Sequence, residues 1–178
     1  MLIGKVANYV IIFIYVIERV LELLVNQHNK KIIIRKYAAK IKSRSEALQM
    51  RIFHMFWFIS LTVETYYRGK MLMGFTLYFC ITLLIIAQSL RWYAIYTLGQ
   101  LWSIDIYQAQ GHPIIETGPY TYIRHPNYLA VIMEFVFLPL MLGCHFTLFV
   151  GSIANFFILR RRIRLEEQLL EDQTYNLT

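Results

Sequence analysis

The sequence predicts an all-α integral membrane protein with about five transmembrane helices, a C-terminal helical hairpin and a cytoplasmic amphipathic helix. Its composition is the first reason: of 178 residues, 57% are hydrophobic and only 16% are charged, whereas a soluble domain carries about a quarter charged residues. The second reason is distribution, because the hydrophobic residues form five segments and the basic residues gather beside them. We therefore predict one membrane domain over residues 1–178.

The five apolar segments cover residues 6–25, 52–66, 74–98, 127–142 and 145–159. A helix needs about 20 residues to cross a ~30 Å hydrocarbon core. The second, fourth and fifth segments are shorter, so we expect their ends to extend into flanking polar residues. The first segment is long enough to span and lacks a small-residue cleavage site, so it is a helix rather than a signal peptide. Gly143 separates the last two segments and predicts a tight hairpin.

The distribution of Lys and Arg predicts the orientation. Residues 26–51 hold eight of the 18, residues 160–164 hold four, and Arg124 adds one. If five segments cross, these thirteen lie on one side, and only Lys5, Arg68 and Lys70 lie on the other. Basic loops stay in the cytoplasm, so we expect an external N-terminus and a cytoplasmic C-terminus. Residues 99–128 then share the cytoplasmic face with the tail after residue 160.

The net charge of +7 does not indicate a nucleic-acid partner. The basic residues lie beside apolar segments, where anionic lipid headgroups account for them, and no nucleic-acid motif is present. His28, His54 and His145 have no neighbours at metal-ligand spacing. We expect membrane lipids as partners, and neither nucleic acid nor a metal ion.

Two stretches carry unusual chemistry. The first is "GPYTYIRHPNY", residues 118–128, which leads directly into an apolar segment. The second is "RRRIRLEE", residues 160–167, in which Arg162 and Glu166 lie one helical turn apart on the same face. Each alone has a plainer interpretation: an interfacial aromatic belt for the first, and a basic stop signal followed by solvated acidic residues for the second.

In this order, around a helical hairpin, the two stretches resemble the isoprenylcysteine carboxyl methyltransferase family and its bacterial members. The resemblance covers residues 99–171, which we take as the cofactor- and acceptor-binding region. It implies a membrane enzyme, in a bacterial inner membrane, that transfers a methyl group from S-adenosylmethionine to a lipid-like or prenylated acceptor. The chain departs from the family after "EE", where a Phe-Gly and further tyrosines usually follow, so the lid over the cofactor is expected to differ.

The resemblance also implies roles for individual residues. Arg162 stands where an arginine faces the methyl acceptor, as a catalytic and substrate-binding residue. An upstream glutamine of the family would fall on Asp105, with Gln108 as a rival, and this choice stays open. The positions that contact the cofactor are His112, Pro113, Ile114, Ile115, Tyr120, His125, Pro126, Asn127, Tyr128 and Glu166.

The chemistry of these side chains agrees with the implied roles. Tyrosine rings can flank adenine and attract a sulfonium cation, and a guanidinium can hold an acceptor carboxylate. A carboxylate with a pKa near ~4 is ionised at neutral pH, so methyl transfer to it requires alignment and exclusion of water rather than a base or metal. The acceptor group is then a carboxylate or an acidic hydroxyl.

Two other functions remain open at this stage. The first is a membrane lipid or sterol-type reductase that uses NADPH, although no glycine-rich phosphate loop is visible. The second is a noncatalytic membrane-interaction protein. Several polar residues within the apolar segments are also open between a functional role and a packing role: Glu18, Arg19, Glu22, Glu134 and Asn155. Arg91 and Trp92 are expected to be interfacial anchors.

Overall fold

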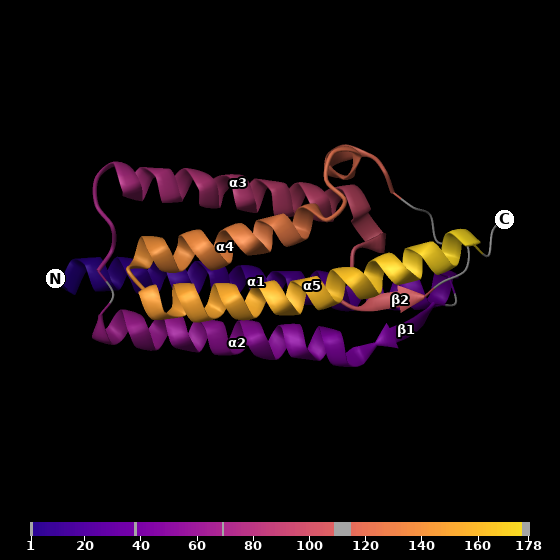
Figure 1. Cartoon of the computed structure of the whole chain (residues 1–178), viewed down its shortest axis with the longest axis horizontal. Coiled ribbons are helices and arrows are strands. Elements are labelled where there is room, and N and C mark those ends of the chain that lie inside the picture. The colour runs from indigo at the N-terminus through magenta and orange to yellow at the C-terminus, as the bar shows by residue number, and fades with distance from the viewer. Residues whose placement is uncertain (1, 38, 69, 109–114, 176–178) are drawn as a thin grey trace.

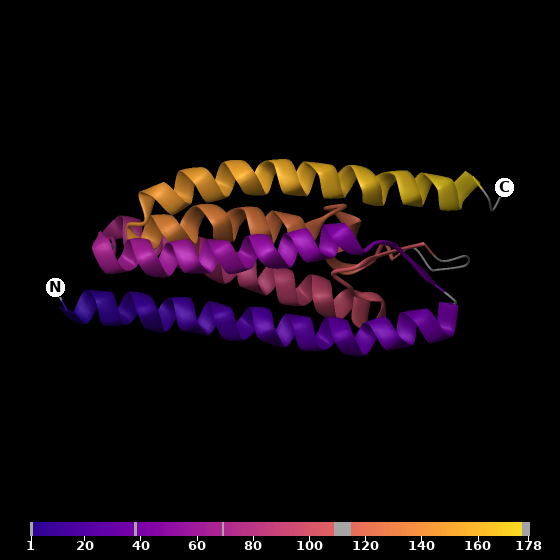
Figure 2. The same cartoon turned by 90° about the horizontal axis from the view of Figure 1, so that it is seen from below.

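A computed structural model describes residues 2–37, 39–68, 70–108 and 115–175, with the backbone alone for residues 2, 3, 108 and 170–175. Long helices run side by side in one elongated bundle (Figures 1 and 2). The N-terminus and the turn between the last two helices lie at one end of the bundle. The C-terminus and the two short strands lie at the other end, which we call the strand end.

Five α-helices account for most of the described chain. They are α1 (Leu2–Tyr37), α2 (Arg44–Tyr67), α3 (Phe75–Leu98), α4 (Pro126–Leu142) and α5 (His145–Tyr175). Helices α3 and α4 match their expected apolar segments within one residue, whereas α1, α2 and α5 extend past theirs. Helix α1 continues twelve residues beyond residue 25, and the hairpin helix and the C-terminal amphipathic helix form one continuous α5. Two 3₁₀ turns, η1 (Gly99–Leu101) and η2 (Gly118–Thr121), lie between α3 and α4.

A small antiparallel sheet at the strand end was not predicted. Strand β1 (Lys40–Ser43) pairs with β2 (Ile106–Gln108), with Lys40 opposite Gln108, Ile41 opposite Tyr107 and Ser43 opposite Ile106. The strands are too short to carry a signal in the sequence, and their pairing depends on the bundle that brings them together. The sheet ties the α1–α2 connection to the segment that follows η1.

Local sequence explains where the helices at this end and at the hairpin begin and stop. The Ser43 hydroxyl accepts a hydrogen bond from the Glu46 backbone N–H at 3.3 Å and caps α2. Pro126 occupies the first turn of α4, where a missing N–H costs nothing. Gly143 ends α4 in the left-handed region at φ 71°, and a Cβ there would lie 2.3 Å from the Lys70 carbonyl oxygen. The hairpin therefore needs glycine at this position.

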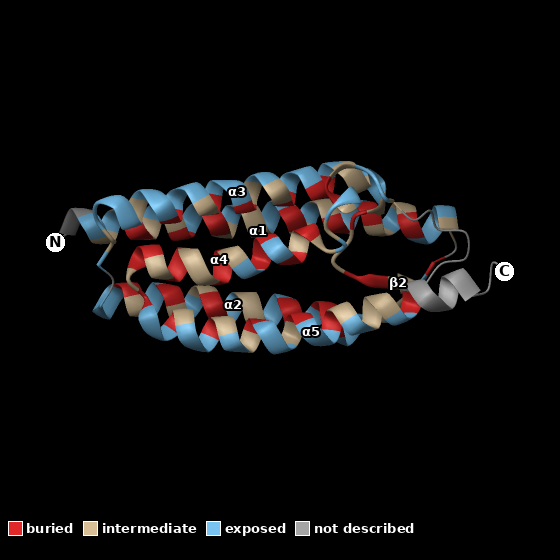
Figure 3. Cartoon of the chain, turned by 45° about the horizontal axis from the view of Figure 1, so that its top comes forward, coloured by how far each residue is buried: buried red, intermediate tan, exposed pale blue. Residues whose placement is uncertain are grey.

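The hydrophobic core takes buried residues from all five helices. The rings of Trp57 and Phe135 stack with their centroids 4.1 Å apart, and Phe53 stacks on the other side of Phe135 at 5.2 Å. Gly151 lets α5 approach Trp57, because a Cβ would lie 2.9 Å from the indole ring. Figure 3 shows this pattern along the bundle, with buried residues on inward faces and exposed residues on outward faces.

The outward faces carry large apolar side chains, among them Phe13 of α1, Phe56 of α2 and Phe149 of α5, all exposed in the isolated chain. A water-soluble monomer rarely exposes so much apolar surface, so the all-helical structure is consistent with a membrane protein. The count of five spans is not established by it. Among the described residues, one helical stretch, Phe75–Leu101, is long and apolar enough to cross a membrane by itself, and α4 is apolar but has 17 residues.

Candidate active site

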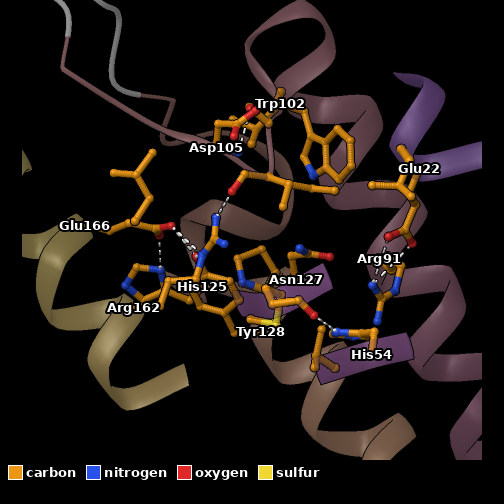
Figure 4. Close-up of a pocket in the computed structure, with 18 of the residues that line it drawn as sticks. Glu22, His54, Arg91, Trp102, Asp105, His125, Asn127, Tyr128, Arg162 and Glu166 are labelled. Carbon is orange, nitrogen blue, oxygen red and sulfur yellow. Dashed lines mark hydrogen bonds and ion pairs between the residues drawn. The ribbon is translucent and has the colours of Figure 1, made fainter. Parts of the chain in front are cut away.

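A cavity of about 1,630 Å³ lies toward the strand end of the bundle. Residues of all five helices and of the α3–α4 connection line it, and Figure 4 shows many of their side chains. All described positions that the resemblance implicates line this cavity: Ile115, Tyr120, His125, Pro126, Asn127, Tyr128, Arg162 and Glu166. Three others, His112, Pro113 and Ile114, lie outside the described residues.

The centre of the site is a hydrogen-bonded group of Arg162, Tyr128 and Glu166, which we call the charged triad. Arg162 Nε donates to the Tyr128 hydroxyl oxygen at 2.7 Å and to Glu166 Oε1 at 3.1 Å. The Tyr128 hydroxyl donates to Glu166 Oε1. Tyr128 lies in the first turn of α4, and Arg162 and Glu166 lie on one face of α5. The hairpin brings α4 and α5 together, and the i,i+4 spacing places Arg162 beside Glu166, so both features assemble the triad.

Arg162 is buried, with 3% of its surface exposed. Its Nη2 donates to the Ile104 carbonyl oxygen, whereas its Nη1 is buried and has no hydrogen-bond partner among the described residues. A buried charged donor without a partner is costly. The free Nη1 on a cavity-lining arginine is what a site for an anionic ligand requires.

His125 extends the triad toward the C-terminal part of α5. Its ring stacks on Tyr128, with centroids 5.3 Å apart and planes 17° from parallel. Its Nδ1 lies 3.8 Å from Glu166 Oε2 and its Nε2 lies 3.6 Å from Glu167 Oε1. Asn127, the next cavity residue, has a buried Oδ1 with no hydrogen-bond partner in the described structure. The start of α4 therefore offers an aromatic face and a free acceptor to a ligand.

Tyr120 lies in η2 and lines the cavity. Burial raises the pKa of its hydroxyl well above the usual 10, and the Glu166 carboxylate raises this pKa further. The ring is therefore neutral at any physiological pH. Gly118 begins η2 at φ 60° and fits against the Thr97 side chain, where a Cβ would lie 2.7 Å from the hydroxyl oxygen. This close approach fixes η2, and with it Tyr120, on the end of α3.

A second polar cluster surrounds Asp105, one of the two residues that the sequence leaves open for the position of the family's glutamine. Asp105 is buried, and its Oδ2 lies 3.5 Å from Lys30 Nζ and 3.7 Å from an Arg51 side-chain nitrogen. Asn26 Nδ2 also donates to Asp105 Oδ2, at 3.4 Å. Asp105 thus joins α1 and α2 at the strand end, and it lines the cavity.

A third cluster of charges crosses the bundle between α1, α3 and α4. Arg91 has 1% of its surface exposed, so the expectation that it anchors the chain at the membrane interface is wrong. Its guanidinium contacts Glu134 at 2.5 Å and Glu22 at 3.3 Å. Arg19 reaches the same two carboxylates, at 3.2 and 2.8 Å respectively. The network cannot be predicted from any one segment of the sequence, because α1, α3 and α4 each contribute only part of it.

The contacts of the charged residues within the apolar segments are those expected if these residues fix how the helices pack. Glu18 accepts hydrogen bonds from Gln88 at 2.7 Å and from the indole N–H of Trp92 at 3.0 Å. Glu134 is 2% exposed and is held by both arginines. Buried charges are tolerated when they are paired in this way. Part of the network faces the site, since Arg19, Glu22 and Arg91 line the cavity.

The comparisons with known proteins identify the class. The family model described as the isoprenylcysteine carboxyl methyltransferase (ICMT) family matches residues 80–172. The chain belongs to this family. Membership supports a methyltransferase in general terms, and the family is membrane-associated. Nothing in the comparisons supports the alternative reductase.

The relatives found cover nearly the whole chain. The "Uncharacterized protein YpbQ" of Bacillus subtilis (strain 168) is 29% identical over 164 residues, which are 92% of this chain and 96% of the relative. An "Uncharacterized protein" of Haemophilus influenzae is 30% identical over 155 residues, 85% of this chain and 88% of the relative. No solved structure matches the chain. The names of these relatives state no substrate.

Proposed function

We propose that the protein transfers a methyl group from S-adenosylmethionine to the carboxylate, or an acidic hydroxyl, of a lipid-like acceptor at the cytoplasmic face of a membrane. One observation carries the proposal. The charged triad, with its unpartnered Arg162 Nη1, lies on the same cavity as an apolar wall formed by α1 and α2. A polar ligand and an apolar ligand can therefore meet there.

The polar part of the cavity fits the proposed cofactor. The unpartnered Asn127 Oδ1 can accept a hydrogen bond from the adenine amino group or the ammonium. The Glu166 carboxylate can accept from the ammonium or a ribose hydroxyl, and the Tyr120 ring offers an aromatic face. When bound, S-adenosylmethionine would supply a methyl group on a cationic sulfonium, which aromatic faces attract.

The apolar part of the cavity fits a lipid tail. On α1 the wall is formed by Val16, Val20 and Leu23, and on α2 by Met55 and Ile59. Val20, Met55 and Ile59 are also exposed on the outside of the bundle. The cavity therefore reaches the outer, lipid-facing surface between these two helices. We propose that the acceptor enters here from the inner leaflet, with its head toward Arg162.

The residues of the triad would act by orientation and charge. Arg162 Nη1 can donate to an anionic acceptor oxygen, in a site where a charge-assisted hydrogen bond is strong. Tyr128 and Glu166 hold the Arg162 side chain in one position, which keeps the acceptor oxygen in line for attack. An ionised carboxylate needs no base, so alignment and exclusion of water are the main tasks of these side chains.

The orientation in the membrane belongs to the same proposal. We propose five crossings, an external N-terminus and a cytoplasmic C-terminus, in a bacterial inner membrane. The excess of Lys and Arg on residues 26–51 and 160–164 supports this orientation. The opposite positions of the N-terminus and the C-terminus along the bundle, visible in Figure 1, agree with an odd number of crossings.

Ligand-dependent thermal stabilisation of the detergent-solubilised protein tests the cofactor proposal. S-adenosylhomocysteine at 100 times its dissociation constant should stabilise the folded state by about 2.7 kcal/mol. NADPH at the same concentration should not shift the transition. Stabilisation by NADPH, and none by S-adenosylhomocysteine, would favour the reductase and contradict the proposal.

A further inference from the structure

The short segment of residues 102–105, between η1 and β2, connects α1 to the charged triad. The Ile104 carbonyl oxygen accepts a hydrogen bond from Arg162 Nη2. Trp102 and Asp105, which bound this segment, lie above Tyr128 in Figure 4. Residues 102–105 belong to no helix or strand, so their backbone groups need other partners if the Ile104 carbonyl is to keep one position.

Asn26 of α1 supplies those partners. It is buried, with 1% of its surface exposed. Its Oδ1 accepts hydrogen bonds from the Ile104 backbone N–H at 2.7 Å and from the Ser103 hydroxyl at 2.8 Å, and its Nδ2 donates to Asp105 Oδ2 at 3.4 Å. A backbone N–H can only donate and an ionised carboxylate can only accept, so these partners leave the Asn26 amide one orientation. Asn26 thus fixes the residue whose carbonyl contacts Arg162.

A second asparagine of α1 supports the same segment from its other end. Asn29 lies one turn beyond Asn26, on the same face of the helix. Its Nδ2 donates to the carbonyl oxygens of Gly99 and Trp102, both at 2.9 Å. The two asparagines together hold residues 99–105 against α1.

The Arg162 guanidinium is held at two of its three nitrogens. Its Nε donates to the Tyr128 hydroxyl at 2.7 Å and to Glu166 Oε1 at 3.1 Å, and its Nη2 donates to the Ile104 carbonyl. A guanidinium is rigid and planar. The contacts at Nε and Nη2 therefore set the direction of Nη1, the nitrogen that has no partner among the described residues. Without the Ile104 contact, the plane could turn while the contacts of Nε persist.

We propose that Asn26 is a positioning residue for methyl transfer, because it fixes the Ile104 carbonyl and thereby aims Arg162 Nη1 at the acceptor. Asn26 is not one of the described residues that line the cavity, so it acts through Arg162. The proposal rests on the proposed function, since it requires that Arg162 contacts the acceptor.

This role affects the acceptor and spares the cofactor. Asn26→Ala removes the amide that holds Ile104, yet it leaves the hydrogen bonds of Arg162 Nε to Tyr128 and Glu166 in place. The side of the cavity proposed for the cofactor should therefore keep its geometry. The acceptor oxygen should lose its alignment, and a misplacement of about 1 Å can slow a reaction roughly 100-fold.

The test measures methyl transfer to an alkyl carboxylic acid in bilayers and S-adenosylhomocysteine affinity on the same variants. Asn26→Ala should lower kcat/KM for the acceptor by ~10- to 100-fold and leave the affinity for S-adenosylhomocysteine unchanged. Asn8→Ala is the matched control, because Asn8 is a buried asparagine of the same helix whose Nδ2 donates to the Leu142 carbonyl oxygen at 3.2 Å, at the opposite end of the bundle. It should keep both values. Unchanged turnover of Asn26→Ala, or an equal loss of turnover and of cofactor binding, would overturn the inference.

A second background separates positioning from general support of the fold. Arg162→Lys keeps a cation but has one nitrogen in place of a planar fork, so the Ile104 carbonyl can no longer set the direction of a separate donor. In this background Asn26→Ala should cost much less kcat/KM than it does in the unchanged protein, because the residue through which it acts has been replaced. Equal losses in the two backgrounds would show a merely structural role and overturn the inference.

Ser103→Ala covers a failure of Asn26→Ala to fold. It removes the Ser103 hydroxyl, which donates to Asn26 Oδ1 and accepts from the Asp105 backbone N–H, and it leaves the hydrogen bond between Ile104 and Asn26. It should lower kcat/KM for the acceptor by ~2–10-fold at unchanged S-adenosylhomocysteine affinity, and in that case no loss would overturn the inference.

The unchanged protein distinguishes a failure of this inference from a failure of the proposed function. If it transfers methyl groups to the lipid and the variants show no loss specific to the acceptor, the inference falls and the proposed function stands. If it transfers methyl groups to no acceptor, both are refuted.

Discussion

Replacing Tyr128 by phenylalanine removes one oxygen atom from the charged triad and leaves the ring in place. That hydroxyl accepts from Arg162 Nε at 2.7 Å and donates to Glu166. The ring that stacks on His125 at 5.3 Å is retained, so the α4 start should keep its conformation. Tyr128→Phe therefore separates the role of the hydroxyl from that of the aromatic face.

The magnitude follows from the contacts that remain. Hydrogen bonds to charged groups contribute about 1.5–3 kcal/mol each. Arg162 Nε keeps its direct contact with Glu166 Oε1 at 3.1 Å, so the loss should be near that of one such bond. A loss of about 2 kcal/mol in cofactor binding corresponds to roughly 30-fold in affinity.

Calorimetric titration of the solubilised protein with S-adenosylhomocysteine measures this effect. Tyr96→Phe is a matched control, because Tyr96 is exposed on α3 and does not line the cavity. It should bind the ligand as the unchanged protein does. Equal affinity of Tyr128→Phe and the unchanged protein would refute the claim that Tyr128 organises Glu166 for the cofactor.

Three further predictions test the fold and the acceptor. Reporter fusions or cysteine labelling should place residues 30–45 and 168–178 on the same inner side, and opposite sides would reject five crossings. Gly143→Ala should lower the thermal unfolding temperature in detergent, because a left-handed backbone costs about 1–2 kcal/mol for alanine and its Cβ would overlap the Lys70 carbonyl. Gly4→Ala is the control, because a Cβ at Gly4 would have no atom within 4 Å. Equal unfolding temperatures of Gly143→Ala and the unchanged protein would contradict the prediction. Acceptors with longer alkyl tails should be methylated more efficiently, by up to ~0.8 kcal/mol per buried methylene, and preference for a short, tail-free acid would exclude lateral access.

The helices could be predicted from the sequence because apolar segments carry a strong signal, but their lengths could not. Helix α1 runs to Tyr37 through a polar stretch in which Asn26 and Asn29 are buried. Asn29 Nδ2 donates to the carbonyl oxygens of Gly99 and Trp102, both at 2.9 Å. In a local stretch of sequence, an asparagine such as Asn29 favours a loop over a helix. Only the contact with a segment seventy residues away makes it part of a helix.

The site shows the same division. The spacing of Arg162 and Glu166 predicts a shared helical face, and the structure joins them at 3.1 Å. Their two expected roles, acceptor and cofactor, are therefore held by one hydrogen-bonded group. Removing the Arg162 guanidinium should disturb Glu166 as well, which the spacing alone did not suggest. The third member, Tyr128, was placed near them by family resemblance and not by any local rule.

The buried arginine of α3 was out of reach for another reason. Arg91 lies in the C-terminal third of the apolar segment 74–98, and an arginine near a segment end is usually an interfacial anchor. Its partners Glu22 and Glu134 come from α1 and α4, so the ion pairs depend on how three helices pack.

The most direct test of the central claim is transfer of a radiolabelled methyl group in proteoliposomes. Protein in bilayers with an alkyl carboxylic acid and methyl-labelled S-adenosylmethionine should release label into the lipid extract as a base-labile methyl ester. Arg162→Ala, which removes the proposed acceptor contact, should abolish most of this signal. Label that never reaches the extract with any carboxylate or hydroxyl lipid, from protein that still binds S-adenosylhomocysteine, would contradict methyl transfer to a lipid-like acceptor.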